Sequence, residues 1–560
     1  MIKKTVLTLS LALIFLQCAM AQWNNNPEEN LILFSGAGIT SVASVKTSDN
    51  NIFVSYFYKE SNNYNLYAQL LDSDGYKLWD ENGLLISSHP QDANPEPQQM
   101  LCDSDDNLVI VMTDQRQNAD LSLFCYKLSQ EGDFLWGSDG LCIFENNNND
   151  WITSISAFCD SDNEIIASIG VFGMSTNSIF LQRIMSDQTL PWGLQGKSIS
   201  DVESQQIFST GDHIVVVFKE LTGDWMNQSA NILFQLFDKN GTPVFAENQI
   251  VTDAGGITWW DKYDALMTNN NQTIITWHDD RYQEMRAKAY AQCIDIDGNS
   301  LWNDNGICLS EEANMNHFYP MVVGQGSDND VVIIWQKTVG DIQFYKSLYG
   351  QKITEDGNLE WGNDGKELLA ECVNFHRING CIMDDNNFFV AFGLHPTEGY
   401  FDTVYTYLGS YSIDNGISNW AEPVQFASSN KSKGWLNLPM IFNDQILITW
   451  MEGSSESIKD VKGQNIWFDG TLGLITGQTT VEENHFIIYP NPTKDYCNLK
   501  YNGADIKTVL IINVQGIVVY KENVNKLSPR INVSRLKKGF YYVQVHTADN
   551  GIYTSKLVKK

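Results

Sequence analysis

Basic residues are scarce in this 560-residue sequence. It contains 36 Lys and Arg against 68 Asp and Glu, which gives a formal net charge of −32. Residues 1–21 carry +2 and residues 486–560 carry +8, which leaves −42 for the rest of the chain. A body of that charge repels nucleic acid and anionic membranes. We therefore predict no nucleic-acid partner, and we interpret the acidity as solubility outside the cell, with calcium binding as the alternative.

Long hydrophobic runs are missing beyond the first residues of the chain. Residues 6–16 form an apolar run after Lys3 and Lys4, and this run is shorter than the ~20 residues that span a bilayer. Small residues follow it, so residues 1–21 are predicted to be a signal peptide cleaved between Ala21 and Gln22. Cys18 leaves a lipoprotein as an alternative, although Gln17 is a poor residue before a lipidated cysteine. We predict a protein that is secreted or held on the outer cell surface, without a transmembrane segment.

Motifs of catalysis and metal binding are also missing. The sequence has no HExxH, GxSxG or GxxxxGK[ST], no CxxC, and no His/Cys cluster with zinc spacing. Nine cysteines would remain after removal of the signal peptide, and Cys372 and Cys381 are the easiest local pair, although connectivity does not follow from sequence. We predict no catalytic residue and no cofactor, with calcium left open. Carboxylates are so abundant that a pair suited to glycoside hydrolysis leaves no sequence trace, and an enzyme therefore stays open.

The chain does contain a tryptophan that returns about every 56 residues, each time at the end of the same phrase. A short run of β-branched and aromatic residues precedes each phrase, which itself contains an Asp/Asn/Gly turn, and no stretch has the pattern of an amphipathic helix. Four predicted strands in a repeat of this length are typical of a β-propeller blade. The phrases end at Trp79, Trp136, Trp192, Phe245, Trp302, Trp361 and Trp420.

The number of blades follows from two counts. Eight buried-strand runs accompany only seven such phrases, because the eighth phrase, from Val461, stops before its aromatic strand. Residues 23–34 resemble that missing strand, and Trp23 precedes Trp79 by the repeat length. We therefore predict an all-β chain whose residues 22–475 form an eight-bladed propeller closed by the N-terminal strand. Closure of the ring leaves no exposed sheet edge at the seam.

The last residues differ in composition from the propeller. After a predicted linker, residues 476–485, the apolar residues of 486–560 alternate between turns, which predicts a small Ig-like β-sandwich. Residues 489–492 (YPNP), 513–516 (NVQG), 536–539 (LKKG) and 556–560 (KLVKK) resemble the type A C-terminal sorting domain of type IX secretion cargo in Bacteroidetes. The resemblance implies that the type IX machinery carries the protein across the outer membrane and that the domain is then removed.

The propeller phrase resembles repeats of secreted bacterial propellers, which combine a Trp-x-Asp-x-Arg strand end with a later YAQ…DxDG…W segment. The best match contains Trp277, Asp279 and Arg281, and Asp114 with Arg116 is a weaker one. The other blades lack the Asp/Arg pair. We therefore interpret it as a buried or bridging ion pair and not as a repeated catalytic element.

Paired acids in the DxDG turns offer another reading. Asp72 with Asp74, and Asp295 with Asp297, have the carboxylates that suit a calcium ion. The other copies replace one or both acids. Because Asp, Asn and Gly are also the residues that tight hairpins require, we interpret these segments as turns.

One position suggests a ligand site. It lies fifteen residues after the repeat aromatic, just before the innermost strand of the next blade, where loops gather around the mouth of the central channel. Aromatic rings and carboxylates together suit carbohydrate, whereas packing between blades is the alternative. We predict a binding or adhesion protein for an extracellular glycan or protein, with a glycan-active enzyme (a glycoside hydrolase or lyase) as the alternative. The candidate ligand-binding residues are Trp151, Trp260, His317, His376 and Trp435.

Overall fold

The structure is a computed structural model of the chain, which falls into two compact units, residues 1–474 and 475–560. The predicted signal peptide and linker lie outside the described residues, so both stay predictions. In the part that is described, no helix is long and apolar enough to cross a membrane. The structure describes residues 23–560 except 93–94, 96–97, 118–119, 148–149, 174–176, 224–228, 259–260, 283–285, 340–345, 373–374, 396–403, 455–456, 475–485, 502–504, 514–517 and 549–551.

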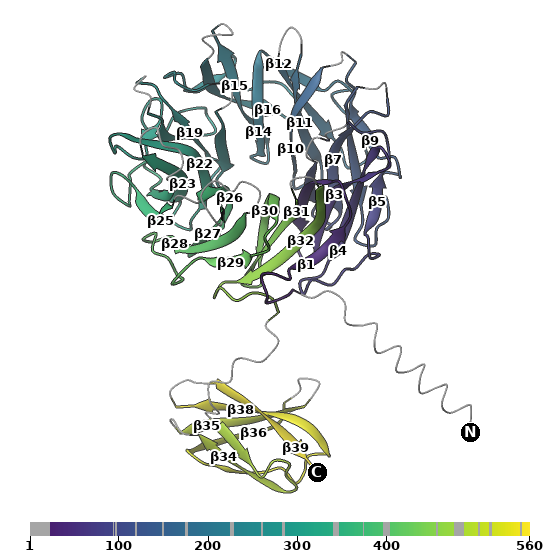
Figure 1. Cartoon of the computed structure of the whole chain (residues 1–560), viewed down its shortest axis with the longest axis vertical. Coiled ribbons are helices and arrows are strands. Elements are labelled where there is room, and N and C mark those ends of the chain that lie inside the picture. The colour runs from purple at the N-terminus through teal and green to yellow at the C-terminus, as the bar shows by residue number, and fades with distance from the viewer. Residues whose placement is uncertain are drawn as a thin grey trace, which may run out of the picture. The chain divides into compact units, whose positions relative to one another are not determined.

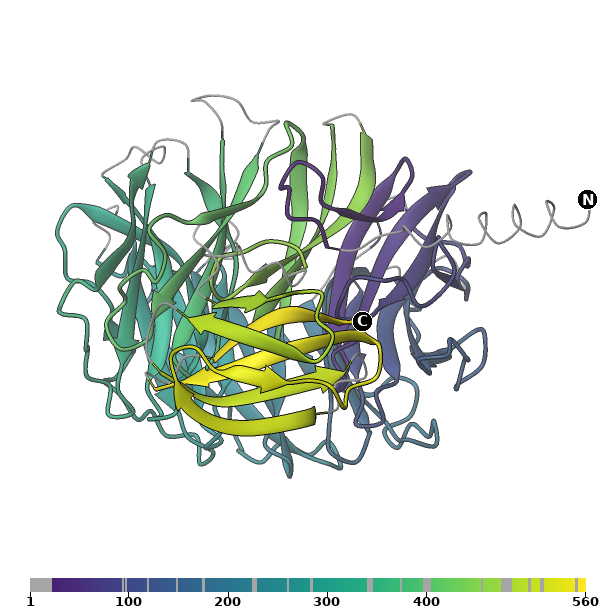
Figure 2. The ribbon, with the colours of Figure 1, turned by 90° about the horizontal axis from the view of Figure 1, so that it is seen from below.

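The first unit consists of eight four-stranded antiparallel sheets that surround a central axis as the blades of a propeller (Figure 1). Their strands run between the two faces of the ring (Figure 2). The first strand of each blade is the innermost. From the innermost to the outermost strand, the blades are: blade 1, β2 (Ile39–Lys46), β3 (Ile52–Glu60), β4 (Asn63–Leu71), β5 (Leu84–Ser87); blade 2, β6 (Gln99–Cys102), β7 (Leu108–Asp114), β8 (Ser122–Leu128), β9 (Leu141–Phe144); blade 3, β10 (Trp151–Cys159), β11 (Ile165–Phe172), β12 (Asn177–Ile184), β13 (Lys197–Ser200); blade 4, β14 (Val202–Ser209), β15 (His213–Thr222), β16 (Ser229–Asp238), β17 (Gln249–Thr252); blade 5, β18 (Tyr263–Met267), β19 (Thr273–Asp279), β20 (Lys288–Ile294), β21 (Ile307–Cys308); blade 6, β22 (Met315–Gln325), β23 (Val331–Val339), β24 (Lys346–Ile353), β25 (Lys366–Cys372); blade 7, β26 (Phe375–Met383), β27 (Asn387–Leu394), β28 (Tyr405–Ser412), β29 (Val424–Ala427); blade 8, β30 (Ser432–Phe442), β31 (Gln445–Ser454), β32 (Ser457–Trp467), β1 (Leu31–Ser35).

The ring closes as the sequence predicts. The N-terminal strand β1 is the outermost strand of blade 8 and pairs antiparallel with β32, with Phe34 opposite Val461. In Figure 1 the purple start of the chain lies against the green strands of blade 8. The buried side-chain amide of Asn30 donates hydrogen bonds through Nδ2 to the Phe426 carbonyl at 2.7 Å and to Gln464 Oε1 at 2.8 Å. Backbone pairing and side-chain bonds therefore join residues from the two ends of the unit.

The hydrophobic core is divided into layers between neighbouring blades. One layer combines Val109 and Val111 of β7 with Ile165 and Ile169 of β11. The second strand of a blade is covered on both faces, and most residues of β7 and β11 are buried. This double coverage explains why these strands consist of nearly unbroken apolar runs in the sequence.

In several blades the repeated tryptophan donates a hydrogen bond to a turn of the next blade, whereas Nε1 of Trp192 and of Trp361 has no hydrogen-bond partner. Trp302 Nε1 donates a 3.0 Å hydrogen bond to the Glu355 carbonyl in the turn of blade 6, and Gly357 of that turn packs against the indole ring. Within its own blade, Gln292 donates to the Asn303 carbonyl at 2.8 Å and accepts from the Trp302 amide at 3.1 Å. Where the indole ring contacts the turn of the next blade, it joins corresponding positions of successive repeats, which explains its spacing of one repeat length. Equivalent indole bonds join Trp23 to Ser73, Trp79 to Gln130 and Trp420 to Phe468.

The innermost strands of at least six blades contain a β-bulge near their start. At each bulge one extra residue of the inner strand lies opposite the second strand. Bulges bend a strand and re-aim the inserted side chain. The residues at the bulges are Ser41, Thr153, Ser204, Tyr319, His376 and Trp435, of which Ser41, Ser204, Tyr319 and Trp435 have φ angles of 56°, 56°, 54° and 51°.

The second unit is a β-sandwich, as predicted. Alternate residues of its strands point inward, and Leu499, Val509, Val543 and Leu557 lie in the core between the sheets. The sheets have the orders β33-β34-β37 and β36-β35-β38-β39, with β33 at Phe486–Tyr489, β34 at Tyr496–Tyr501, β35 at Ile506–Asn513, β36 at Val518–Lys526, β37 at Arg530–Asn532, β38 at Gly539–Thr547 and β39 at Ile552–Lys559.

The described cysteines carry free thiols. The suggested local pairing of Cys372 with Cys381 is therefore wrong in this structure. Cys381 lies in the layer between blades 6 and 7, where it contacts the Val322 carbonyl through its thiol. Burial raises the pKa of the Cys381 thiol, which keeps it protonated and unreactive.

Candidate functional site

Four of the five predicted ligand residues lie near the start of an innermost strand, toward the face of the propeller at which these strands begin; they are Trp151, His317, His376 and Trp435. We call this face the entry face. Trp151 begins β10 and leaves 73% of its surface exposed, and Trp435 is 44% exposed at the bulge of β30. His376 lies at the bulge of β26, but its side chain is not described, and Trp260 lies outside the described residues. The four described positions lie in blades 3, 6, 7 and 8, so two blades separate Trp151 from the other three in either direction around the ring.

His317, the fifth predicted residue, is fully buried in β22. Its Nδ1 accepts a 2.8 Å hydrogen bond from Trp335 Nε1. Burial, reinforced by the charges of Lys337 and Lys288, lowers the pKa of His317 to about 3. The structure thus places His317 as a neutral packing residue in the core and not at a surface that contacts ligand.

A cavity of about 540 Å³ opens on the entry face across blades 3, 4 and 5. At its blade 3 side the ring of Trp151 stacks on that of Phe172, with ring centroids 6.2 Å apart and an interplanar angle of 30°. Phe172 is 48% exposed and lines the cavity. Phe172 thus brings an exposed aromatic pair to the edge of a concave site, with Trp151 stacked on it just outside the lining. Its polar lining consists mainly of Asn177, Glu203, Gln205, Lys219, Asp261 and Lys262.

The floor of the cavity contains a buried lysine. Lys219 of β15 is 2% exposed, and its Nζ lies 3.2 Å from Glu203 Oε1 and 3.1 Å from the Asp261 carbonyl. The other carboxylate oxygen of Glu203 accepts a 3.2 Å hydrogen bond from Asn177 Nδ2. Burial lowers the pKa of Lys219, although the Glu203 charge opposes that shift. A perturbed amine in a concave site is a group that can exchange protons.

A chain of contacts extends from the cavity into blade 6. Asp261 Oδ1 lies 3.2 Å from His278 Nε2, and His278 Nδ1 accepts a 3.4 Å hydrogen bond from the Tyr319 amide. Because Nδ1 accepts this hydrogen bond, the imidazole proton lies on Nε2, the nitrogen that faces Asp261. Burial raises the pKa of Asp261, but hydrogen bonds from His278 and Thr258 outweigh this and lower it overall, so the carboxylate stays charged. The Tyr319 ring meets the His278 ring edge-on at 5.4 Å.

Tyr263 also lines the cavity, but its hydroxyl is committed to the fold. It donates to the Val217 carbonyl at 2.7 Å and also contacts the Ser204 carbonyl. Burial raises its pKa well above the usual value. The phenol therefore joins the innermost strand of blade 5 to the first two strands of blade 4, and its proton is not available to a ligand.

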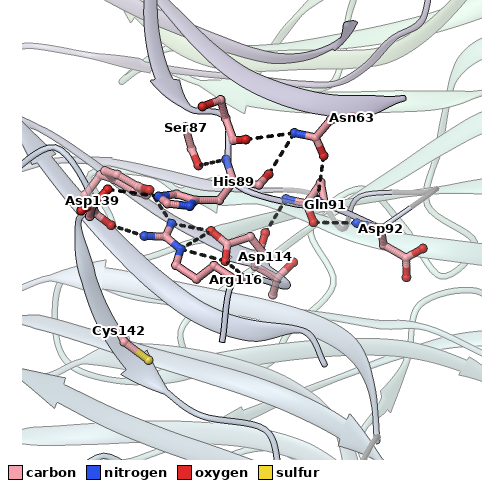
Figure 3. A network of polar contacts seen from close by, with 12 residues as sticks. Asn63, Ser87, His89, Gln91, Asp92, Asp114, Arg116, Asp139 and Cys142 are labelled. Atoms are coloured by element: carbon pink, nitrogen blue, oxygen red, sulfur yellow. Dashed lines mark hydrogen bonds and ion pairs between the residues drawn. The ribbon is translucent and has the colours of Figure 1, made fainter. Parts of the chain in front are cut away.

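The Asp/Arg pairs are buried ion pairs, as interpreted from the sequence. The guanidinium of Arg116 bonds the buried Asp114 carboxylate and the Asp139 carbonyl, while His89 Nε2 lies 3.1 Å from Asp139 Oδ1 (Figure 3). Asp279 and Arg281 repeat this arrangement in blade 5. These bonds join the end of a second strand to the outer strand of the same blade. They support the blades and lie apart from the cavity lining.

The acidic turns make the bonds expected of turns. Asp72 Oδ1 accepts from the backbone amides of Asp74 and Tyr76, and Asp295 makes the same bonds with Asp297 and Asn299. Across the described residues no group of three or more His, Cys, Asp or Glu side chains could hold a metal ion. Calcium binding therefore stays a prediction from the sequence, and the described residues contain no such cluster to support it.

Comparison with known proteins identifies the export signal. Residues 487–560 match the family described as the secretion system C-terminal sorting domain. The second unit is thus a type IX secretion sorting domain, and the protein is secreted or located at the cell surface. A relative, "Ulvan lyase NLR42" of Nonlabens ulvanivorans, is 33% identical over 72 residues, which cover 13% of this chain and 14% of that protein. The chain therefore shares only a small part of that relative's length.

Solved structures resemble the propeller weakly. A PL25 polysaccharide lyase described as an ulvan lyase is 10% identical, with a TM-score of 0.42, over 80% of this chain and 98% of that chain. The Dos1 propeller gives a TM-score of 0.42 at 9% identity over 78% of this chain and 95% of that chain. An acylaminoacyl peptidase of Pyrococcus horikoshii gives 0.37 at 11% identity over 77% of this chain and 59% of that chain.

Proposed function

We propose that the propeller binds an extracellular polysaccharide in the cavity of blades 3 to 5. The proposal rests on the exposed Trp151–Phe172 pair at the rim of a concave site that also contains carboxylates and amides. The CH faces of sugars pack on aromatic rings, and their hydroxyls bond to carboxylate and amide groups. The cavity volume is within the usual range for ligand sites. Export by the type IX route brings this site to where such polymers occur.

Binding can be tested with the mature propeller and soluble ulvan, alginate, polygalacturonate and laminarin in affinity electrophoresis. We expect retention by at least one polymer and a loss of about tenfold in affinity for Trp151→Ala, because truncation removes the exposed ring. Tyr76→Ala is the matched control, since Tyr76 is an exposed aromatic residue in a turn of the opposite face. Equal binding by wild type and Trp151→Ala would contradict the proposal.

Cleavage of the bound polysaccharide is a second candidate, and the name of the curated relative favours it over adhesion. The structural feature that supports it is Lys219, a buried amine of lowered pKa in the cavity floor. In its neutral form such an amine can take the C5 proton of a uronate. The C4–O bond then breaks and a C4=C5 double bond forms, while the leaving oxygen takes a proton from water and the Lys219 ammonium returns its proton to the solvent. The exposed Lys262 also lines the cavity, and its positive charge would attract the uronate carboxylate.

The two candidates are separated by the ultraviolet absorbance of the unsaturated uronate, followed with the same polymers. Lyase activity predicts rising absorbance with wild type and its loss with Lys219→Arg, because arginine retains the charge near Glu203 but does not give up its proton. Retention of a polymer without any such absorbance, and without shortening of the chain, would leave binding as the function.

A further inference from the structure

Tyr319 combines three properties that packing alone does not explain. It is the extra residue at the bulge of β22, its φ of 54° lies in the left-handed region, and its side chain is 53% exposed. A bulky residue in that region is a genuine outlier and is destabilised by roughly 1–2 kcal/mol. In blades 1 and 4 the equivalent bulge positions are occupied by Ser41 and Ser204, and in blade 8 by Trp435, which is also exposed. The bulge therefore does not require a large side chain, and Tyr319 and Trp435 are the described positive-φ bulge residues that present a ring there.

The backbone around Tyr319 connects it to the cavity. Its amide bonds His278, whose other ring nitrogen lies beside Asp261 of the cavity lining. The His278 ring is packed edge-on against both Phe318 and Tyr319. The bulge thus holds one exposed aromatic ring beyond the blade 5 wall of the cavity, while the Trp151–Phe172 pair occupies its blade 3 side. Between the two lie the polar groups of blades 4 and 5.

We propose that Tyr319 forms a second sugar-binding platform, so that the entry face holds an extended internal stretch of a polysaccharide. This inference rests on the proposed function and names the form of its ligand. Packed sheets lie ~10 Å apart, so platforms on blades 3 and 6 are separated by more than the width of one sugar ring. A monosaccharide reaches one platform only. An oligosaccharide that crosses Glu203, Lys219 and Asp261 reaches both.

The proposal predicts that affinity depends on chain length. The probe is the polymer retained best in the electrophoresis described above, cut by partial acid hydrolysis into di-, tetra-, hexa- and octasaccharides and titrated calorimetrically. For wild type, affinity rises until the oligosaccharide reaches both platforms and is constant thereafter. Tyr319→Ala removes this gain, so that long chains lose about tenfold in affinity and disaccharides lose none. Tyr319→Phe keeps the ring and retains the gain.

Each result has a distinct meaning. Trp151→Ala weakens binding at every length if the proposed function holds. If Trp151→Ala has that effect and Tyr319→Ala changes no length, or changes all lengths equally, the second platform is refuted and the proposed function stands. If wild type binds no oligosaccharide and no polymer, both fall. Thermal unfolding of Tyr319→Ala and of Tyr76→Ala, the control on the opposite face, shows whether either variant disturbs the fold.

Discussion

Ionisable residues of the inner strands differ in whether they line the cavity or lie in the core. Lys219 and Glu203 pair with each other and line the cavity, so their charges can act on a ligand. His317 is enclosed between blades and makes its bond to another core side chain. Sequence spacing could not separate the two kinds, because His317 has the same offset from its repeat aromatic as the exposed Trp151. At the scale of single residues, burial and partners decide function.

The burial of His317 predicts that the protein loses stability in acid. Its pKa is about 3 in the folded chain against 6.5 for an ordinary histidine, so between these values the unfolded chain binds more protons. The contribution of His317 to the free energy of unfolding is therefore complete above pH 6.5 and is lost as the pH falls below that value. By pH 4 the loss amounts to about 3 kcal/mol. Urea unfolding of wild type at pH 7 and at pH 4 measures it.

The matched variant is His317→Gln, which can still accept a hydrogen bond from Trp335 Nε1 but does not titrate. Other groups contribute to acid unfolding in both proteins, so the comparison is the difference between their pH dependences. We expect the variant to lose less stability than wild type between the two pH values. Identical pH dependence would show that His317 does not titrate as a buried neutral residue.

At the scale of structural elements, the indole-to-turn contact explains why the repeat exists and can be tested at a glycine. Gly357 has a φ of +83°, and a Cβ there would lie 2.7 Å from Trp302 Cδ1. Gly362 has a φ of +89°, but a Cβ there would meet nothing within 4 Å. Gly362→Ala should destabilise by about 1–2 kcal/mol through backbone strain alone. Gly357→Ala should add about 1–3 kcal/mol because the indole must move.

Denaturant midpoints of the two glycine variants give the comparison directly. The difference between them isolates the steric contact from the strain that both alanines share. If Gly357→Ala is no more destabilising than Gly362→Ala, the blade-to-blade contact of Trp302 contributes little. In that case the periodic aromatic would need another explanation, such as the buried indole area alone.

The strands were predictable from the sequence, whereas the bulges were not. Apolar runs such as 108–112 identify second strands because both faces of these strands are covered by neighbouring blades. A bulge adds a residue without changing composition, so nothing in the sequence around Tyr319 marks its position. The fixed offset of fifteen residues also fails in blade 4, where it falls on Ile207, counted from Trp192. Only Asp201 connects β13 to β14, so Ile207 lies well inside β14 instead of before it. Glu203, Lys219 and Asp261 come together through tertiary structure alone, although a lysine that ends the buried run of β15 is a signal that could have been followed.

At the scale of the whole molecule, the two units have separate tasks, and export belongs to the second. Removal of residues 487–560, which match the sorting domain, should leave the propeller folded but retained in the periplasm of a type IX host. The full-length protein should reach the medium or the cell surface. Its intact mass should lack residues 1–21 and the residues after about 486. A released protein that keeps its C-terminal residues would contradict the removal step, and export of the truncated chain would contradict the role of the domain.

Closure of the ring is the property on which the first unit depends most. Residues 23–35 place Trp23, Leu31, Leu33 and Phe34 in the core layer that joins blade 8 to blade 1. At about 1.5–3 kcal/mol for each buried side chain, their removal costs on the order of 10 kcal/mol, which is comparable with the stability of a whole domain. It also exposes the edge of β32 to other chains. We expect a propeller without residues 22–35 to aggregate or to remain unfolded in size-exclusion chromatography and circular dichroism.

A circular permutant distinguishes loss of the strand from loss of its position in the chain. The Leu474 amide bonds the Trp23 carbonyl at 3.4 Å, so the two ends of the propeller meet. Residues 36–474 followed by a short glycine linker and residues 22–35 can therefore form the same ring with β1 joined directly after blade 8. This permutant should recover the unfolding midpoint of the intact propeller to within a few degrees, because every contact of β1 with β32 is restored. If the deletion variant is as stable as the intact propeller, or if the permutant behaves like the deletion, the closing strand does not stabilise the ring as its buried contacts require.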